Sequence, residues 1–188
     1  YIGMRIPKSV NELTLNKYIR LEQIKAQKFE LGIDRSIKLA SFITGLSISD
    51  LEALPIIKLE KLLIKVNRLA DSQPTLKIKR TIWVNKKRYT ACKDEHHFNT
   101  NQYTALKHLE ANSKFNIHKM LSIIYLPHPL FKKAKFSPND ITTIAYEFYN
   151  KATVGQVYGT LFFYSNRFEI QNIISQLSLI QSQMEIEN

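Results

Sequence analysis

Phe42-Ile-Thr-Gly-Leu-Ser-Ile-Ser-Asp-Leu-Glu-Ala-Leu-Pro55 is the stretch that decides the fold, because it contains the end of one helix and the starts of two more. Gly45 supplies the left-handed residue that commonly ends a helix. Ser47 caps a short helix, with Asp50 at the third position, where a carboxylate faces the positive end of the helix dipole. The closing proline breaks the chain before a longer amphipathic segment. The stretch therefore predicts three successive helices.

Beyond this proline, apolar residues recur with the spacing of one helix face. They are Leu59, Leu62, Leu63, Val66 and Leu69. Residues three, four and seven apart lie on one side of a helix, so we expect this stripe to face the core. The opposite side carries a basic stripe, made of Lys58, Lys61, Lys65 and Arg68. Such a stripe is typical of a solvated helix surface, and the alternative is a docking face for an acidic partner.

Helical spacing of apolar residues extends over most of the chain. Besides the two helices that follow Gly45, we predict helices at about 14–30, 35–44, 101–111, 116–126, 137–151 and 153–184. Gly32 interrupts the chain between the first two. Ser137-Pro138-Asn-Asp140 and Thr153-Val-Gly-Gln156 are start signals for the last two, because they place a cap residue and its acidic or amide partner at the right spacing.

The pattern changes after Asp71-Ser-Gln-Pro74, where helical spacing gives way to alternation of apolar and polar residues. The alternating apolar positions are Leu76, Ile78, Ile82 and Val84. Asn85-Lys-Lys is the candidate turn, and Arg88 to Cys92 is the returning strand. We interpret residues 73–93 as one inserted β-hairpin, which is the only strand signal in the chain.

Basic residues dominate this hairpin, and residues 74–93 contain no acid. A basic ribbon with exposed aromatic rings can follow a phosphate backbone and stack bases. The alternative nucleic-acid site consists of Lys77, Lys79, Arg80, Trp83, Lys86, Lys87, Arg88 and Tyr89. The simpler interpretation, which the sequence favours, is an ordinary two-stranded ribbon with a solvated face and Trp83 packed on a helix.

The composition limits the classes of protein. A chain of 188 residues with 44% hydrophobic content suits one sizeable core or two small lobes and argues against disorder. No apolar run approaches the ~20 residues that span a bilayer, so we expect no membrane segment. A single cysteine, Cys92, excludes an internal disulfide and suits a reducing compartment. The net charge of +11 indicates attraction to nucleic acid, an anionic surface or an acidic protein.

Motifs for catalysis or cofactor binding are missing from the sequence. It has no glycine-rich phosphate loop, no nucleophile elbow and no zinc-protease helix. The nearest approach to a metal cluster is a set of histidines without a second cysteine, made of His96, His97, His108, His118 and His128. A lone cysteine is more often buried and inert than catalytic. We therefore predict no enzyme, no cofactor and no metal site.

The last predicted helix changes character along its length. Its first half, from Val154 to Phe163, is apolar nearly all round and is expected to be buried. Its second half carries a narrower apolar stripe beside Gln, Ser and Asn residues. Such a helix covers a core or binds a partner helix. The candidate partner-binding residues are Ile173, Leu177, Ile180 and Met184, together with the basic stripe of Lys58, Lys61, Lys65 and Arg68.

Together these segments predict a mainly α fold, a helical bundle of about seven helices with one inserted β-hairpin. The predicted units are an N-terminal helical lobe with an extended arm at 1–72, the hairpin at 73–93 and a C-terminal helical lobe at 94–188. Residues 15–21 resemble 100–106, and residues 37–43 resemble 118–124. Two interpretations stay open: a pair of pseudo-repeated helical lobes, or chance likeness between amphipathic helices.

Short motifs across the chain are similar to those of one group of viral proteins. They are Ile6-Pro7-Lys-Ser-Val-Asn-Glu-Leu-Thr14 with Tyr18, Thr44-Gly45-Leu46, Asp50-Leu51, Trp83-Val84-Asn85, Tyr103 and Phe162-Phe163. In these motifs the chain resembles tail assembly chaperones and virion morphogenesis proteins of tailed bacteriophages, in particular the crAss-like phages of Bacteroidetes.

The resemblance implies a non-enzymatic role in assembling a tail or virion through protein–protein contacts. The implied partners are other phage structural proteins or further copies of the chain, with nucleic acid as a further candidate and no membrane. The implied location is the host cytoplasm during assembly, or the virion. The net charge of +11 departs from the acidic or neutral balance expected of such chaperones and favours a component retained in the particle near DNA.

Overall fold

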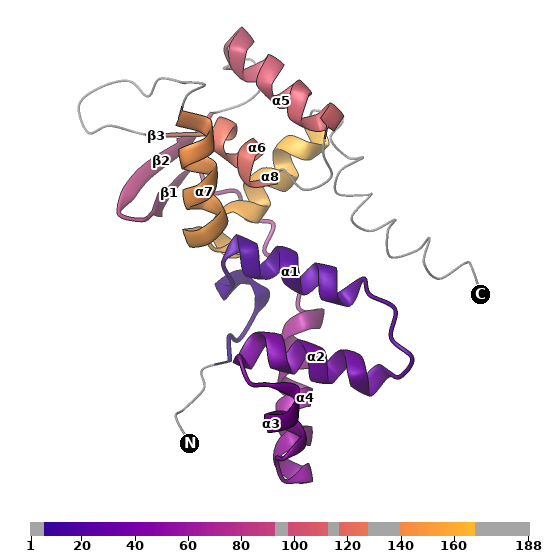
Figure 1. Ribbon diagram of the computed structural model, residues 1–188. Coiled ribbons are helices and arrows are strands. Elements are labelled where there is room, and N and C mark those ends of the chain that lie inside the picture. The colour runs from indigo at the N-terminus through magenta and orange to yellow at the C-terminus, as the bar shows by residue number, and fades with distance from the viewer. Residues whose placement is uncertain (1–5, 93–97, 113–116, 128–139, 168–188) are drawn as a thin grey trace.

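The computed structural model describes residues 6–92, 98–112, 117–127 and 140–167 of the chain. In these residues it is mainly helical, with one small antiparallel sheet of three strands (Figure 1). The predicted fold class, mainly α with a β-hairpin, is confirmed. Helices α1 to α4 form an N-terminal lobe, and the sheet with helices α5 to α8 forms a C-terminal lobe (Figure 1). None of the described helices is long and apolar enough to span a bilayer.

The N-terminal lobe consists of one short 3-10 helix and four α-helices. They are η1 (Val10–Glu12), α1 (Leu15–Lys25), α2 (Gly32–Thr44), α3 (Ile48–Glu52) and α4 (Ile56–Asp71). The first α-helix ends at Lys25 rather than near Glu30 as predicted, because the chain turns there toward α2 and Phe29 packs against the core of this lobe. Gly32, predicted to lie between helices, is the first residue of α2.

The joints between α2, α3 and α4 form as the sequence predicts. Gly45 has a φ of 76°, and its amide donates to the Ser41 carbonyl, which closes the last turn of α2. The Ser47 hydroxyl accepts from the Asp50 amide, and the Asp50 carboxylate accepts from the Ser47 amide, so both halves of a capping box are present. The three successive helices are therefore confirmed.

The apolar stripe of α4 faces the core, as predicted. Val66 and Leu69 are buried, and Leu59, Leu62 and Leu63 pack against the same cluster. The other buried members of this cluster are Val10, Leu13, Leu21, Ile24, Leu39, Ala40, Leu51, Ala70 and Val154. These side chains come from every helix of the lobe and, at Val154, from α8 of the C-terminal lobe. Removal of this common apolar surface from water therefore holds the N-terminal helices together and attaches them to α8.

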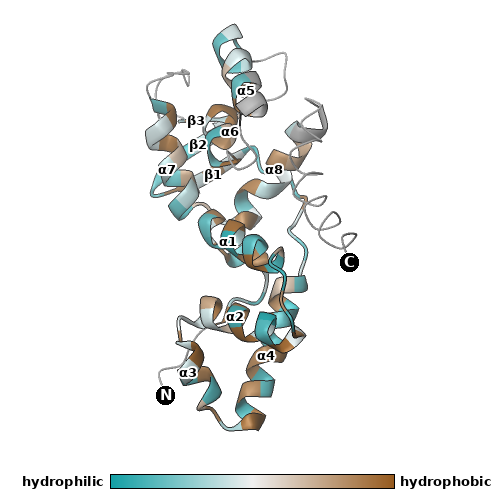
Figure 2. Ribbon diagram, turned by 45° about the vertical axis from the view of Figure 1, so that its right-hand side comes forward, coloured by the Kyte–Doolittle hydropathy of each residue, from teal (hydrophilic) through white to brown (hydrophobic). Residues whose placement is uncertain are grey.

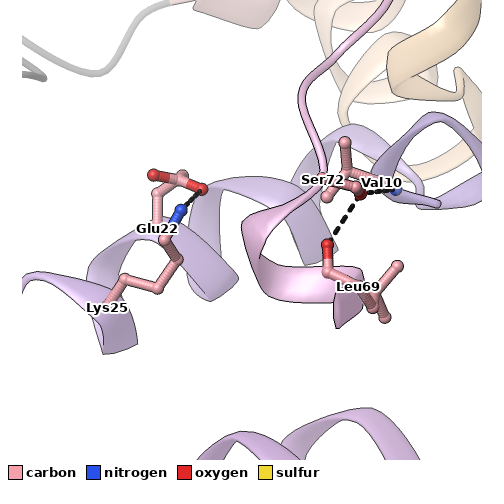
Figure 3. A network of polar contacts seen from close by, with 5 residues as sticks. All are labelled: Val10, Glu22, Lys25, Leu69 and Ser72. Carbon is pink, nitrogen blue, oxygen red and sulfur yellow. Dashed lines mark hydrogen bonds and ion pairs between the residues drawn. The ribbon is translucent and has the colours of Figure 1, made fainter. Parts of the chain in front are cut away.

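Ser72, directly after α4, ties this helix to the beginning of the chain (Figure 3). Its hydroxyl accepts from the Val10 amide at 3.1 Å and donates to the Leu69 carbonyl at 2.7 Å. Val10 is fully buried, so its amide has no water molecule as an alternative partner. Nearby, Glu22 and Lys25 form an ion pair on α1 (Figure 3), whose partly exposed position makes its contribution small.

The C-terminal lobe contains four helices and the sheet. Its elements are β1 (Thr81–Val84), β2 (Lys87–Ala91), α5 (Thr100–Asn112), α6 (Ile117–Ile124), β3 (Tyr125–Pro127), α7 (Ile141–Lys151) and α8 (Val154–Arg167). The prediction that the hairpin is the only strand signal is wrong, because β3 pairs antiparallel with β2. α6 stops earlier than predicted, since the Ile124 carbonyl accepts from the Cys92 amide and the chain continues as a strand. β1 begins at Thr81 rather than at Leu76.

Residues 76–79 lie across α8 instead of continuing the sheet. Gly159 of α8 leaves the space for their backbone, since a Cβ atom there would lie 2.4 Å from the Lys77 carbonyl oxygen. The Thr160 hydroxyl accepts from the Lys79 amide at 3.2 Å. α8 therefore fixes the chain just before β1, and it explains why the alternating pattern of this segment does not produce a longer strand.

The buried face of the hairpin belongs to the core of the C-terminal lobe. Ile82, Val84 and Tyr89 are buried in one cluster with side chains of α6, α7 and α8. The rings of Tyr89 and Tyr125 both pack on Phe148, with centroid distances of 5.1 and 5.7 Å. The hairpin, which the sequence set apart as a unit, thus shares one core with the helices that follow it. α1 packs on α2 and α5 on α6, and the suggested duplication stays a prediction.

Candidate interaction surfaces

The side of α4 that faces away from the core carries basic and apolar side chains and the exposed acid Glu60. The predicted basic stripe is exposed along its whole length, at Lys58, Lys61, Lys65 and Arg68. Ile57 and Ile64 lie on the same side and are 63% and 45% exposed. Two side chains seven positions apart on a helix point in directions that differ by only about 20°, so Ile57 and Ile64 are aligned along α4. We call this set of six residues the α4 surface.

Apolar exposure continues at the start of α4. Ile56 is 80% exposed, and Ile48 of α3 is also exposed. Figure 2 shows apolar residues at this end of the lobe, which is the end farthest from the sheet. Single exposed isoleucines are ordinary, whereas several on one part of a surface mark a site for another protein. The α4 surface and this end of the lobe are therefore candidates for a protein contact.

The candidate residues of the last helix lie outside the described residues. They are Ile173, Leu177, Ile180 and Met184, and their role in partner binding stays a prediction. The described first part of that helix is α8, where Val154, Val157 and Leu161 are buried as predicted. The Thr153 amide donates to the Gln156 side chain at 2.9 Å, which is one half of the predicted capping box.

The two aromatic residues of the hairpin lie on opposite faces. Tyr89 is 1% exposed and packs in the core, so it is not available to stack a base, and its place in the predicted nucleic-acid site is wrong. Trp83 is 60% exposed, which contradicts the interpretation that it packs on a helix. Strand register is the cause: Trp83 pairs with Arg88 and Ile82 pairs with Tyr89, and successive residues alternate between the two faces.

Lys87 is occupied by a contact with α7. Its ammonium group forms an ion pair with Glu147 at 2.5 Å, and the Tyr89 hydroxyl donates to the same carboxylate at 2.6 Å. Burial alone would raise the pKa of Glu147, but the hydrogen bonds from Lys87 and Tyr89 and the charge of Lys87 hold this pKa below its usual value. Burial, followed by the contact with Glu147, raises the pKa of Tyr89. This cluster fastens the hairpin to α7.

The other predicted cations of the hairpin region remain available. Lys77, Arg80 and Lys86 are exposed, and Lys79 and Arg88 are half-buried. In the part of the chain that the structure describes, none of these five forms an ion pair. The hairpin therefore keeps Trp83 with its cross-strand partner Arg88 and the turn residue Lys86, whereas Lys77, Lys79 and Arg80 belong to the segment before β1. Lys87 and Tyr89 are lost from the predicted site.

Two of the five histidines, His108 and His118, fall on described residues. His108 is exposed on α5, whereas His118 of α6 is half-buried with its ring 5.0 Å from that of Tyr149. Burial, followed by the charge of Lys119, lowers the pKa of His118. His96, His97 and His128 lie outside the described residues. Across the described ranges, no three His, Cys, Asp or Glu residues are grouped closely enough to hold a metal ion.

Cys92 lies at the end of β2, where packing and backbone contacts determine its position. Its amide donates to the Ile124 carbonyl at 3.1 Å, and its sulfur accepts from the Gln102 side chain at 3.7 Å. Gln102 is buried and also donates to the Ile123 carbonyl at 3.1 Å. These contacts connect α5 and α6 to the sheet.

Ile57 and Ile64 are the surface residues that sequence reasoning missed. The signal was present, because both fall outside the leucine stripe and on the basic side of the predicted helix. A scan against protein-family models, a search of curated proteins and a search of solved structures each find no match to this chain. The two surfaces and the sequence motifs are therefore the features from which a function can be inferred.

Proposed function

We propose that this protein is a non-enzymatic assembly protein of the tailed-phage type, which binds other structural proteins through the α4 surface. The observation that supports this best is the aligned pair Ile57 and Ile64, exposed on a helix side that also bears four cations. The motif resemblance supports the phage context, with the host cytoplasm or the virion as the place of action. Protein contact, rather than catalysis, is the activity that such a surface provides.

The partner that fits the α4 surface is an acidic amphipathic helix. Isoleucines one heptad apart pack against a matching apolar stripe, because both helices repeat their contacts at the same interval. Burying the exposed parts of the two side chains contributes about 1–2 kcal/mol each. The four neighbouring cations favour carboxylates at the edge of the contact. They disfavour the same surface of a second copy, since like charges would then face each other.

Site-specific crosslinking tests this proposal directly. A photoreactive residue at position 64, introduced in cells that produce the phage particle, is expected to crosslink to an acidic helical segment of a structural protein. The same residue at position 28, which is exposed in the segment between α1 and α2, is the control. Crosslinks from position 64 to segments without acidic residues, or no more crosslinks than from position 28, would refute the proposal.

Charge reversal provides the matched comparison. The triple variant Lys61→Glu, Lys65→Glu, Arg68→Glu is expected to lose the crosslinked partner. The control variant Lys8→Glu, Lys17→Glu, Lys28→Glu changes the net charge by the same amount at other exposed positions and is expected to keep it. Equal loss in both variants would assign the binding to net charge rather than to the α4 surface.

A further inference from the structure

We propose that the outward face of the hairpin binds single-stranded nucleic acid, with one base stacked on Trp83 and phosphates held by the cations around it. This activity is separate from the protein contact of α4, because it uses a different lobe and different side chains. Three properties of the hairpin carry it: the position of the indole ring, the support behind that ring, and the distribution of charge.

Trp83 is exposed, and Arg88 is its partner on the neighbouring strand. The Ala91 amide donates to the Arg80 carbonyl, so residues 80 and 91 form a hydrogen-bonded pair. Pairs alternate along an antiparallel ladder, which makes Trp83 and Arg88 a non-hydrogen-bonded pair, the type in which side chains lie closest. Trp83 makes no ring contact with any residue that the structure describes. A base can therefore approach the ring while its phosphate meets Arg88.

The ring sits on a rigid support. Ile82 and Val84, its neighbours along β1, are buried in the core, and the Trp83 carbonyl accepts from the Gln156 side chain at 3.1 Å. Asn85 and Lys86 have φ values of 49° and 63°, which are the positive values of a tight two-residue hairpin turn. A stacking residue fixed in this way loses little conformational entropy when a base binds.

The chain on both sides of Trp83 carries charge of one sign. Residues 72–92 contain no acidic side chain, and the nearby Glu147 is already occupied by Lys87 and Tyr89. The cations left for phosphates are Arg88, opposite Trp83, and Lys86 in the turn, followed by Lys77, Lys79 and Arg80 along the segment that leads into β1. Contact with about four phosphates predicts a slope of about −3 for the logarithm of affinity against the logarithm of salt, at ~0.7 for each phosphate of a single strand.

Single-stranded nucleic acid is the ligand that uses all of these features. In a duplex the bases are stacked on each other, and their faces are not accessible to an indole ring on a flat ribbon. An acidic peptide would use the cations but has no planar group for Trp83 to stack on. An unstacked base offers a flat ring, and base–aromatic stacking strengthens binding by about 5- to 150-fold per base.

The fluorescence of Trp83 provides the first measurement, because this is the one tryptophan of the chain. Titration of the full chain with a thymidine oligonucleotide is expected to quench it. An abasic oligonucleotide of equal length and inorganic polyphosphate carry charge without bases, and we expect both to bind at least 5-fold more weakly. Equal binding of the thymidine and abasic strands, tighter binding of a duplex, or no binding at low salt would overturn the proposal.

Variants then separate stacking from charge, with a fluorophore on the oligonucleotide as the probe. Trp83→Ala is expected to abolish the preference for the thymidine strand over the abasic strand, and Trp83→Phe to restore part of it. Lys86→Glu with Arg88→Glu is expected to weaken both strands and to reduce the salt slope. Lys61→Glu with Lys65→Glu on α4 is the matched control, and an equal loss there would overturn the proposal. Circular dichroism confirms that each variant folds.

Discussion

Replacing Gly159 by alanine tests the contact that places residues 76–79 on α8. The added Cβ would lie 2.4 Å from the Lys77 carbonyl oxygen, 2.5 Å from the Leu76 carbonyl carbon and 2.6 Å from the Lys77 carbonyl carbon. Favourable contacts between such atoms are about 3.5–4.0 Å, so one backbone must move by about 1 Å. All three neighbours are backbone atoms, and no change of side-chain rotamer relieves the clash.

The size of the effect follows from three contributions. Overpacking of this kind costs about 1–3 kcal/mol. Movement of the segment also weakens the hydrogen bonds of Lys79 with Thr160 and Tyr125, each of which contributes about 1 kcal/mol. Alanine has a higher helix propensity than glycine, which offsets about 1 kcal/mol of this loss. We expect a net loss of about 2 kcal/mol, which lowers the melting temperature by about 4–8 °C in a chain of this size.

Thermal unfolding followed by circular dichroism measures this loss. Gly32→Ala is the matched control, because Gly32 also lies in a helix but a Cβ there meets no atom within 4 Å. We expect the control to be unchanged or up to about 1 kcal/mol more stable. If Gly159→Ala melts at or above the temperature of the wild type, residues 76–79 do not cross α8 at this position.

Two further predictions concern Glu147, which binds the sheet to α7, and Ser72, which directly follows α4. Glu147→Ala leaves the Tyr89 hydroxyl without its acceptor and is expected to lower the free energy of unfolding, measured in urea, by about 1–3 kcal/mol. Lys87→Ala removes the exposed partner of the same carboxylate and is expected to lower it by less than ~1 kcal/mol. The pKa of Glu147 is lower in the folded than in the unfolded chain, so its contribution to stability is present above about pH 4.3 and is lost as the pH falls through the folded pKa. If the stability of wild type and of Glu147→Gln decreases identically at acid pH, this prediction is contradicted. Ser72→Ala removes the acceptor of the buried Val10 amide and is expected to cost about 1–3 kcal/mol in the same assay, and a change below ~0.5 kcal/mol would show that this amide has another partner.

The N-terminal lobe could be predicted well because its signals are local. Gly45 ends a helix through its own backbone conformation, and Ser47 and Asp50 satisfy each other within one turn. The leucine stripe of α4 needs only the helical period to identify the buried side. No partner far away in the chain had to be known for any of these features, which is why all three are present in the structure.

The sheet depends on contacts between distant parts of the chain and was predicted only in part. β3 exists because α6 ends where the Cys92 amide meets the Ile124 carbonyl, and no local pattern marks that point. The opposite orientations of Trp83 and Tyr89 follow from register. Trp83 follows the buried Ile82 in β1, so its side chain points to the opposite face of the sheet. The two-residue turn brings Tyr89 opposite Ile82. Knowing the turn length would have removed Tyr89 from the stacking site.

The two proposed surfaces share a positive sign but differ in the apolar groups beside their cations. Aliphatic side chains on α4 gain from exclusion of water, which salt does not weaken, whereas phosphate contacts at the hairpin weaken steeply as salt is added. The double reversals Lys61→Glu with Lys65→Glu and Lys86→Glu with Arg88→Glu change the net charge equally. The long-range effect of net charge therefore cancels in a comparison of the two variants. A difference between them identifies the local chemistry of each surface, and equal effects on both ligands would leave only the overall charge of +11 as the cause.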